Sequence, residues 1–387
     1  MDEYKLILDF LTPLGVNTAV YRSLSKLLIA KMEAPQLSIR AAKKWGILDL
    51  SSSFHYNQLE VLGNLFIRGF ITLKDFLPFF SSDTKICDAT YLKREGKKVY
   101  ATKRLRNYNI GCYELLQDVL FTVERYKGVN FIYDFKIINH NKRHRTKPQE
   151  IMEAIKTGKI KKGDWFVIDG GLKAGKLMRE ARKAGVKVAT RLDSNFVVAR
   201  FGTEFRKEDV LNNIKPIKRT IYGKSHIIYS LKRCVWQGTA GNLFLVRGEG
   251  YGDFIPLFTT ALNAKPETVI RKYKERPSIE QTIKKLKSYL KIEGNHYTKK
   301  GSNYGYIFML CLVYNFIQHL RLYLVELSFK NILDALSTCL LRKYPPKRMF
   351  SFENACEAML KDIGCKRFNK INNSLTGSIS LSGKVTS

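Results

Sequence analysis

The sequence predicts an α/β domain that follows a helical region and contains a β-rich insertion. Short apolar strands alternate with helical segments between about residues 85 and 193, which is the pattern of βαβ units. Helical spacing dominates residues 1–82, and strand signals return at about 200–262 before helices resume. The chain has 387 residues, a length typical of two or three domains at roughly 100–200 residues each.

The composition is that of a folded protein with a large excess of basic residues. Apolar residues make up 45% and charged residues 26%, which excludes a disordered chain and a small disulfide scaffold. Lys and Arg number 67 against 34 Asp and Glu, so the net charge is +33. Because such an excess repels itself in a compact fold, it favours a polyanionic partner. Nucleic acid is the leading candidate, and an anionic membrane surface is the less supported alternative.

The N-terminus, the apolar runs and the cysteines favour a cytoplasmic protein with no membrane partner. The first residues, MDEYKLILDFL, lack the cationic start of a secretory signal. The longest apolar run, residues 306–314, is far shorter than the roughly 20 residues that span a bilayer. Seven cysteines occur without a CxxC pair, so neither a zinc site nor a disulfide framework is expected.

Residues 1–82 predict a set of short helices. Apolar residues recur at helical spacing over 18–32, 38–46 and 54–69. Two interpretations fit this region about equally well, because helix-turn-helix patterns are degenerate. One is a DNA-binding helix-turn-helix, and the other is a small helical bundle with a solvated basic surface.

The α/β domain is predicted over 83–330. Its first part predicts strands and helices in the order strand 85–92, a hairpin continuing at 99–102, strand 130–138, helix 148–158, strand 164–169, helix 172–185 and strand 186–193. The insertion contains a hairpin of strands 226–236 and 243–248, after which helices run from about 266 to 328. Residues 331–387 predict one amphipathic helix, 353–363, and a loose tail from Asn372.

The helix predicted over 266–291 carries the most informative polar residues. With Tyr273 at 0°, Arg276, Glu280 and Lys287 fall at about 300°, 340° and 320°, within one narrow sector beside the apolar stripe. A carboxylate there can hold a metal ion, and the cations can hold phosphates. An ordinary solvated face of an amphipathic helix is the simpler interpretation of the geometry, and Pro277 starts or kinks the helix.

The spacing Tyr273-x2-Arg276-x3-Glu280-x6-Lys287 resembles the YREK signature of DDE transposases encoded by bacterial and archaeal insertion sequences. The resemblance covers about residues 85–290. It implies a ribonuclease H-like core and a transposase that binds the terminal inverted repeats of its element. Such an enzyme uses Mg²⁺, for which Mn²⁺ can substitute, to cut double-stranded DNA and join the 3′-OH ends to target DNA. A homodimer on paired DNA ends and a nucleoid-associated, prokaryotic location are implied too.

The resemblance also implies three catalytic, metal-binding acids. Glu280 is the third by the signature, and Asp88 and Asp169 correspond best to the first and second. Asp169 closes a strand, where ligands of open α/β sheets gather. Asp88 interrupts an apolar strand, which costs free energy unless the carboxylate is used or paired. The competing acids are Asp134, Asp164 and Asp193.

By the same resemblance, Tyr273, Arg276 and Lys287 contact DNA near the cleaved end. Trp236 is the candidate for stacking a flipped base, and its alternative is a half-buried hairpin tryptophan. Two basic segments fit a DNA surface, residues 90–108 and 141–147. The first includes Lys103, Arg104 and Arg106.

Three other interpretations stay open. Gly170-x4-Gly175-Lys176 follows a strand and opens a helix like a P-loop, but Leu177 stands where a Ser or Thr would bind Mg²⁺. The second alternative is a ribonuclease H-like nuclease that cuts DNA without joining it. The third is a non-catalytic DNA-binding protein of transposase descent.

Overall fold

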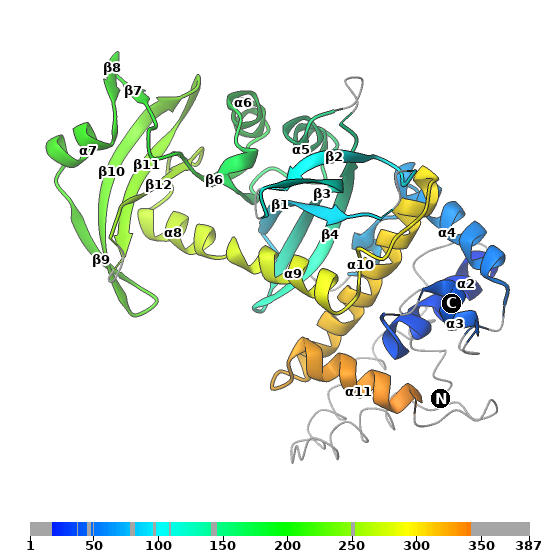
Figure 1. Cartoon of the computed structure of the whole chain (residues 1–387). Helices are drawn as coiled ribbons and strands as arrows, with labels where there is room; N and C mark the ends of the chain where they lie inside the picture. Colours follow the sequence, from blue (N-terminus) through cyan, green and yellow to red (C-terminus); the bar gives the residue numbers. More distant parts are fainter. Residues whose placement is uncertain are drawn as a thin grey trace, which may run out of the picture. The chain divides into compact units, whose positions relative to one another are not determined.

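The computed structural model describes residues 18–341, except 37, 45–47, 49, 78–81, 96–97, 108–109, 141–144 and 249–251 (Figure 1). The chain forms two compact units, one of residues 79–285 and one of residues 1–78 with 286–387. The helix expected at 353–363 and the tail from Asn372 lie outside the described residues, as does most of the basic segment 141–147.

The unit of residues 79–285 is built on one mixed sheet, which confirms the α/β class. Among the described residues the sheet has twelve strands, in the order β2-β3-β1-β5-β6-β12-β11-β10-β7-β8, with β4 paired to β3 and β9 to β10. The strands are β1 (Thr84–Lys93), β2 (Thr102–Asn107), β3 (Cys112–Tyr126), β4 (Val129–Ile138), β5 (Trp165–Ile168), β6 (Lys187–Arg191), β7 (Val198–Arg200), β8 (Thr203–Phe205), β9 (Ile217–Ile221), β10 (Lys224–Trp236), β11 (Thr239–Gly248) and β12 (Ile255–Thr259).

Helices cover both faces of the central strands. The helices of this unit are α5 (Lys147–Lys156), η3 (Gly170–Leu172), α6 (Gly175–Lys183), α7 (Lys207–Asn213), α8 (Pro266–Lys274) and α9 (Pro277–Ser288), of which the last three residues group with the other unit. Helices α5 and α6 lie on one side of β1 and β6, and α8 with α9 runs along the other (Figure 1). Helix α8 contacts β5 and β6. Strand β5 pairs in parallel with both β1 and β6, and all four of its residues are buried, as expected of a strand covered on both faces.

The longest strand, β3, was not among the elements that the sequence predicts. It pairs with β1, β2 and β4 and so holds the antiparallel half of the sheet together. Its polar residues, among them Gln117, Asp118 and Glu124, interrupt the apolar alternation that marks a strand. All three of these residues are buried, and each contacts a polar group distant in the sequence, on Arg94, Lys147 and Ser82 respectively.

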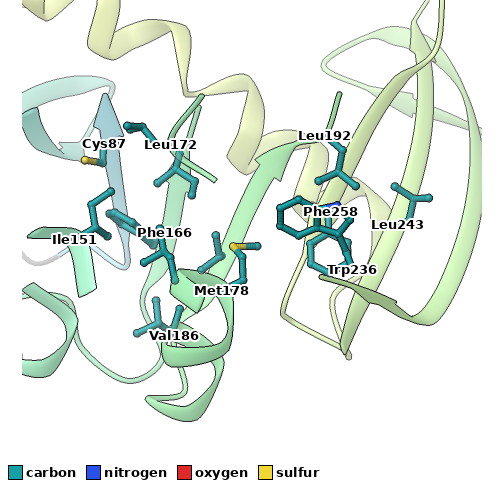
Figure 2. Close-up of a cluster of buried hydrophobic side chains, with 14 of the residues drawn as sticks. Cys87, Ile151, Phe166, Leu172, Met178, Val186, Leu192, Trp236, Leu243 and Phe258 are labelled. Atoms are coloured by element: carbon teal, nitrogen blue, oxygen red, sulfur yellow. The ribbon is translucent and has the colours of Figure 1, made fainter. Parts of the chain in front are cut away.

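The β insertion extends the main sheet and does not form a separate one. Strand β12 pairs antiparallel with β6, and β11 and β10 follow. One hydrophobic core is shared by the central strands and the β insertion (Figure 2). It includes Cys87 and Phe166 of the central strands and Trp236, Leu243 and Phe258 of the insertion. The predicted hairpin of 226–236 and 243–248 is confirmed, with β11 beginning four residues earlier than expected.

The other unit is helical, which confirms the helical N-terminal region. It contains α2 (Thr18–Glu33), α3 (Ile39–Lys44), α4 (Ser52–Ile67), η2 (Leu73–Phe76), α10 (Lys300–Tyr323) and α11 (Phe329–Leu341). These units do not coincide with the expected domains 1–82, 83–330 and 331–387, because residues 286–330 group with the N-terminal helices. The physical reason is that the apolar face of α10 packs on α4 and α2.

Three glycines allow the backbones of α4 and α10 to touch. A Cβ added at Gly63 of α4 would overlap the carbonyl oxygen of Gly301 and stand 2.5 Å from the amide nitrogen of Gly305. We therefore expect Gly63→Ala to lower the free energy of unfolding by about 2 kcal/mol, since overpacking of a core typically costs 1–3 kcal/mol.

Urea unfolding followed by circular dichroism measures this effect. The matched control is Gly252→Ala, because a Cβ at Gly252 meets nothing within 4 Å and its φ is not positive. If both variants unfold at the wild-type urea concentration, the close helix contact is not needed for stability.

Candidate active site

Two of the candidate acids meet where the parallel pairing of two adjacent strands ends. Asp88 is the fifth residue of β1, and Asp169 directly follows β5. The register pairs Cys87 with Ile168, so the next residue of each strand, Asp88 and Asp169, falls at the same level of the sheet. Parallel pairing therefore brings together two carboxylates that are 81 positions apart in the sequence.

The third acid, Glu280, lies on α9, one turn after the break between α8 and α9. The predicted helix 266–291 is interrupted at Glu275–Arg276, because Pro277 cannot donate a helical hydrogen bond and restricts the residue before it. Arg276 stands in this break, with its amide donating to the carbonyl of Tyr273 at 2.9 Å.

The guanidinium of Arg276 contacts all three carboxylates. Its Nη2 lies 3.0 Å from Oδ2 of Asp88 and 3.3 Å from Oδ1 of Asp169, and its Nη1 donates to Oε1 of Glu280. The three acids thus converge on one cation, although they come from the middle of one strand, the end of another and a helix. The Nε atom of Arg276 is buried and has no hydrogen-bond partner among the described residues.

Burial sets the protonation behaviour of this cluster. It raises the pKa of Asp88 to about 6, and the Arg276 guanidinium opposes this rise. Burial also raises the pKa of Tyr273 to about 12, so its phenol is protonated and can donate a hydrogen bond at neutral pH. The pKa of Arg276 is raised, because its three carboxylate neighbours outweigh the opposing effect of burial.

The three carboxylates suit a hard divalent cation in chemical type, but they are too far apart to bind one in this arrangement. Carboxylate oxygens are the ligands that Mg²⁺ prefers. In this structure the guanidinium of Arg276 occupies the position between them and balances their charge. In the part of the chain that the structure describes, however, no three His, Cys, Asp or Glu side chains are grouped closely enough to hold one metal ion. The carboxylates would have to close on a metal as the guanidinium leaves.

Each competing acid has a lysine partner of its own. Asp134 pairs with Lys159, Asp164 with Lys85 and Asp193 with Lys173, each at 2.8 Å. A fourth acid, Asp118, went unnoticed in the sequence because β3 was not predicted. It is fully buried and contacts Lys147 at 2.8 Å and His140 at 3.1 Å.

Lys287, the last signature residue, and the cations of β2 lie outside the group of three acids. Lys287 belongs to the helical unit, where its ammonium pairs with Glu293 at 3.6 Å. Lys103, Arg104 and Arg106 are exposed on β2. Strand β2 ends the path of paired strands, so these cations stand at an edge of the sheet.

Trp236 requires a correction. Its side chain is only 5% exposed and packs against Phe258, with ring centroids 5.8 Å apart (Figure 2). A base therefore cannot stack on this ring, and the simpler interpretation, a hairpin tryptophan in the core, is the right one. Apolar alternation in β10 directs Trp236 inward, with more burial than the sequence suggested.

The segment that resembles a P-loop is already engaged in protein contacts. The amide of Gly175, at the start of α6, donates to Oε1 of Gln237 at 3.0 Å. The ammonium of Lys173 lies 2.8 Å from the carbonyl of Gly170. A phosphate cradle needs such amides turned toward the ligand, so the geometry disfavours the nucleotide-binding alternative.

The fold and the site define an α/β protein in which three acids surround an arginine, close to the point where the parallel pairing of β1 and β5 ends. Residues 128–316, just under half of the chain, match the family model of the transposase DDE domain. This part of the chain is therefore similar to the transposase DDE domain, a similarity that suggests a ribonuclease H-like fold and DNA transposase activity. Enzymes of this family are generally metal-dependent and cut and join DNA.

The match contains Asp169, Glu280 and the other signature residues, whereas Asp88 precedes it. Comparison with curated proteins gives no match. Within the described residues, helices long and apolar enough to cross a membrane are absent.

Proposed function

We propose that this protein is a Mg²⁺-dependent DNA transposase of the YREK group, encoded by a prokaryotic insertion sequence. It binds the terminal inverted repeats of its element as a homodimer, cleaves there and joins the 3′-OH ends to target DNA. The observation that carries the proposal is the convergence of Asp88, Asp169 and Glu280 around Arg276. The family match and the net charge of +33 support it.

The three carboxylates would hold the divalent ions, Mg²⁺ or Mn²⁺. When bound, such ions activate the attacking oxygen and stabilise the leaving oxygen of an in-line displacement at phosphorus. With its acidic partners engaged by metal, Arg276 would hold a DNA phosphate, and the protonated Tyr273 phenol would donate to another phosphate oxygen. Lys287 and the exposed cations of β2 add sequence-independent phosphate contacts.

A strand-transfer assay with the full chain tests this function. A donor plasmid carries the DNA that flanks the gene, and a second plasmid serves as target. We expect joined product in Mg²⁺ and none in EDTA. Cleavage without joined product would favour the nuclease alternative, and DNA binding without cleavage would favour the non-catalytic one. ATP turnover abolished by Lys176→Ala would instead favour the nucleotide-binding alternative.

A further inference from the structure

A second group of cations lies where α8 packs against the β insertion, around an aromatic turn residue. Strands β9 and β10 are joined by Tyr222 and Gly223, whose φ angles are +51° and +73°. Two positive φ angles define a type I′ turn, in which Asn, Asp or Gly normally takes the first position. A tyrosine there costs conformational free energy. Tyr222 is 61% exposed, so burial of its ring does not repay that cost.

Two cations of α8 lie against the Tyr222 ring. Cζ of Arg271 and Nζ of Lys274 are each 5.6 Å from its centroid, a cation–π distance. Nζ of Lys274 also lies 2.8 Å from Nε2 of the buried His226, whose Nδ1 lies 2.8 Å from the carbonyl of Lys224. Nδ1 of His226 therefore donates to that carbonyl, and Nε2 accepts from Lys274.

This group of cations has no matching carboxylate in the described part of the chain. Lys224, Arg271 and Lys274 are all exposed, and none of them forms an ion pair there. Burial and the charge of Lys224 both lower the pKa of Lys274. Neighbouring cations behave differently, since Lys272 pairs with Asp83 and Arg219 with Glu267, each at 2.8 Å. Three like charges gathered in this way repel each other unless an anion joins them.

The cluster faces away from the candidate active site. Tyr273 faces the active site, since the charges of Asp169 and Asp88 act on its phenol. At about 100° per residue, Lys274 and Arg271 project roughly 100° and 160° from Tyr273 around α8. A DNA segment held by this cluster is therefore not the segment whose phosphate meets the three acids.

We propose that Tyr222, Lys224, Arg271 and Lys274 form a separate binding site for the phosphate backbone of duplex DNA. The three cations bind phosphates, and the Tyr222 ring holds Arg271 and Lys274 in place and packs against the DNA backbone. This site rests on the proposed function only in that its partner is DNA. Its contacts carry no base sequence information, so it would strengthen binding to specific and unrelated duplexes alike.

Salt-dependent binding of the full chain to fluorescein-labelled duplexes tests the three cations. We expect the triple variant Lys224→Gln/Arg271→Gln/Lys274→Gln to bind at least tenfold more weakly at about 0.1 M salt. The slope of log K against log salt should fall by roughly 2 to 3, since each phosphate contact contributes about 0.9. The charge-matched control is Lys127→Gln/Lys156→Gln/Lys183→Gln, three exposed lysines of the same unit. Equal losses in the two triple variants would overturn the site.

Tyr222→Asn tests the aromatic residue without changing any charge. Asn tolerates a positive φ, so the variant should unfold at an unchanged or higher urea concentration and yet bind duplex DNA at least threefold more weakly. Wild-type affinity in this variant would overturn the proposed site. If the wild-type chain itself binds no DNA, the proposed function fails. If the wild-type chain binds and joins DNA but the two triple variants have equal affinity for duplex DNA, only the proposed second binding site is refuted.

Discussion

Glu280→Gln is expected to reduce DNA cleavage by roughly 10³-fold or more. Glutamine keeps the size of the side chain but removes the charge that would hold a divalent ion. Metal stabilisation of the transition state is worth several kcal/mol, and about 4 kcal/mol corresponds to three orders of magnitude in rate. Asp88→Asn and Asp169→Asn should have the same effect. Single-turnover cleavage of labelled donor DNA in Mg²⁺ provides the measurement.

Asp193→Asn is the matched control for these three variants. Asp193 also follows a strand of the sheet, but it is exposed, pairs with Lys173 at 2.8 Å and forms no ion pair with Arg276. We expect this variant to cleave at a rate close to that of the wild type, and all four variants to bind duplex DNA with near wild-type affinity. Cleavage by Glu280→Gln at a rate near that of Asp193→Asn would refute the assignment of the acids.

Arg276→Ala is expected to change two properties in opposite directions. Without the guanidinium that contacts Asp88, Asp169 and Glu280, a divalent ion no longer has to displace a bound cation. The affinity of the DNA-free protein for Mn²⁺ should therefore rise about tenfold, a change of about 1.4 kcal/mol. Cleavage should fall by roughly 10²-fold, because the variant loses the cation proposed to hold a DNA phosphate, a loss of about 2.7 kcal/mol.

Titration of Mn²⁺ followed by electron paramagnetic resonance separates the two effects. Arg179→Ala serves as control, since the guanidinium of Arg179 bonds the carbonyl of Gln237 at 2.7 Å and forms no ion pair with the three acids. An Mn²⁺ affinity that is unchanged or reduced in Arg276→Ala would show that this arginine does not compete with the metal.

Strand and helix order could be predicted where the local pattern was clean. The apolar run of β5 and the helix ending at Gly158 were placed within one or two residues of their observed limits. Strand β3 could not be predicted, because its polar residues are satisfied by partners such as Lys147 and Arg94 that are distant in the sequence. The grouping of α10 with the N-terminal helices is likewise a long-range effect.

The residues of the candidate site were likewise predicted only in part. Sequence reasoning selected Asp88, Asp169 and Glu280, and the structure brings all three to Arg276. The same reasoning selected Trp236, which tertiary packing buries, and it passed over the cations around Tyr222. Spacing on one helix shows which residues share a face, but it does not show which strand or turn lies opposite that face.

The sequence by itself determined the α/β class, the basic charge and the spacing of Tyr273, Arg276, Glu280 and Lys287, because these depend on composition and on local periodicity. Only the tertiary structure decided that Arg276 stands among three acids and that Tyr222 gathers exposed cations. Both arrangements depend on strand register and on how α8 and α9 lie across the sheet. These are set by long-range packing, which no single segment of the chain encodes.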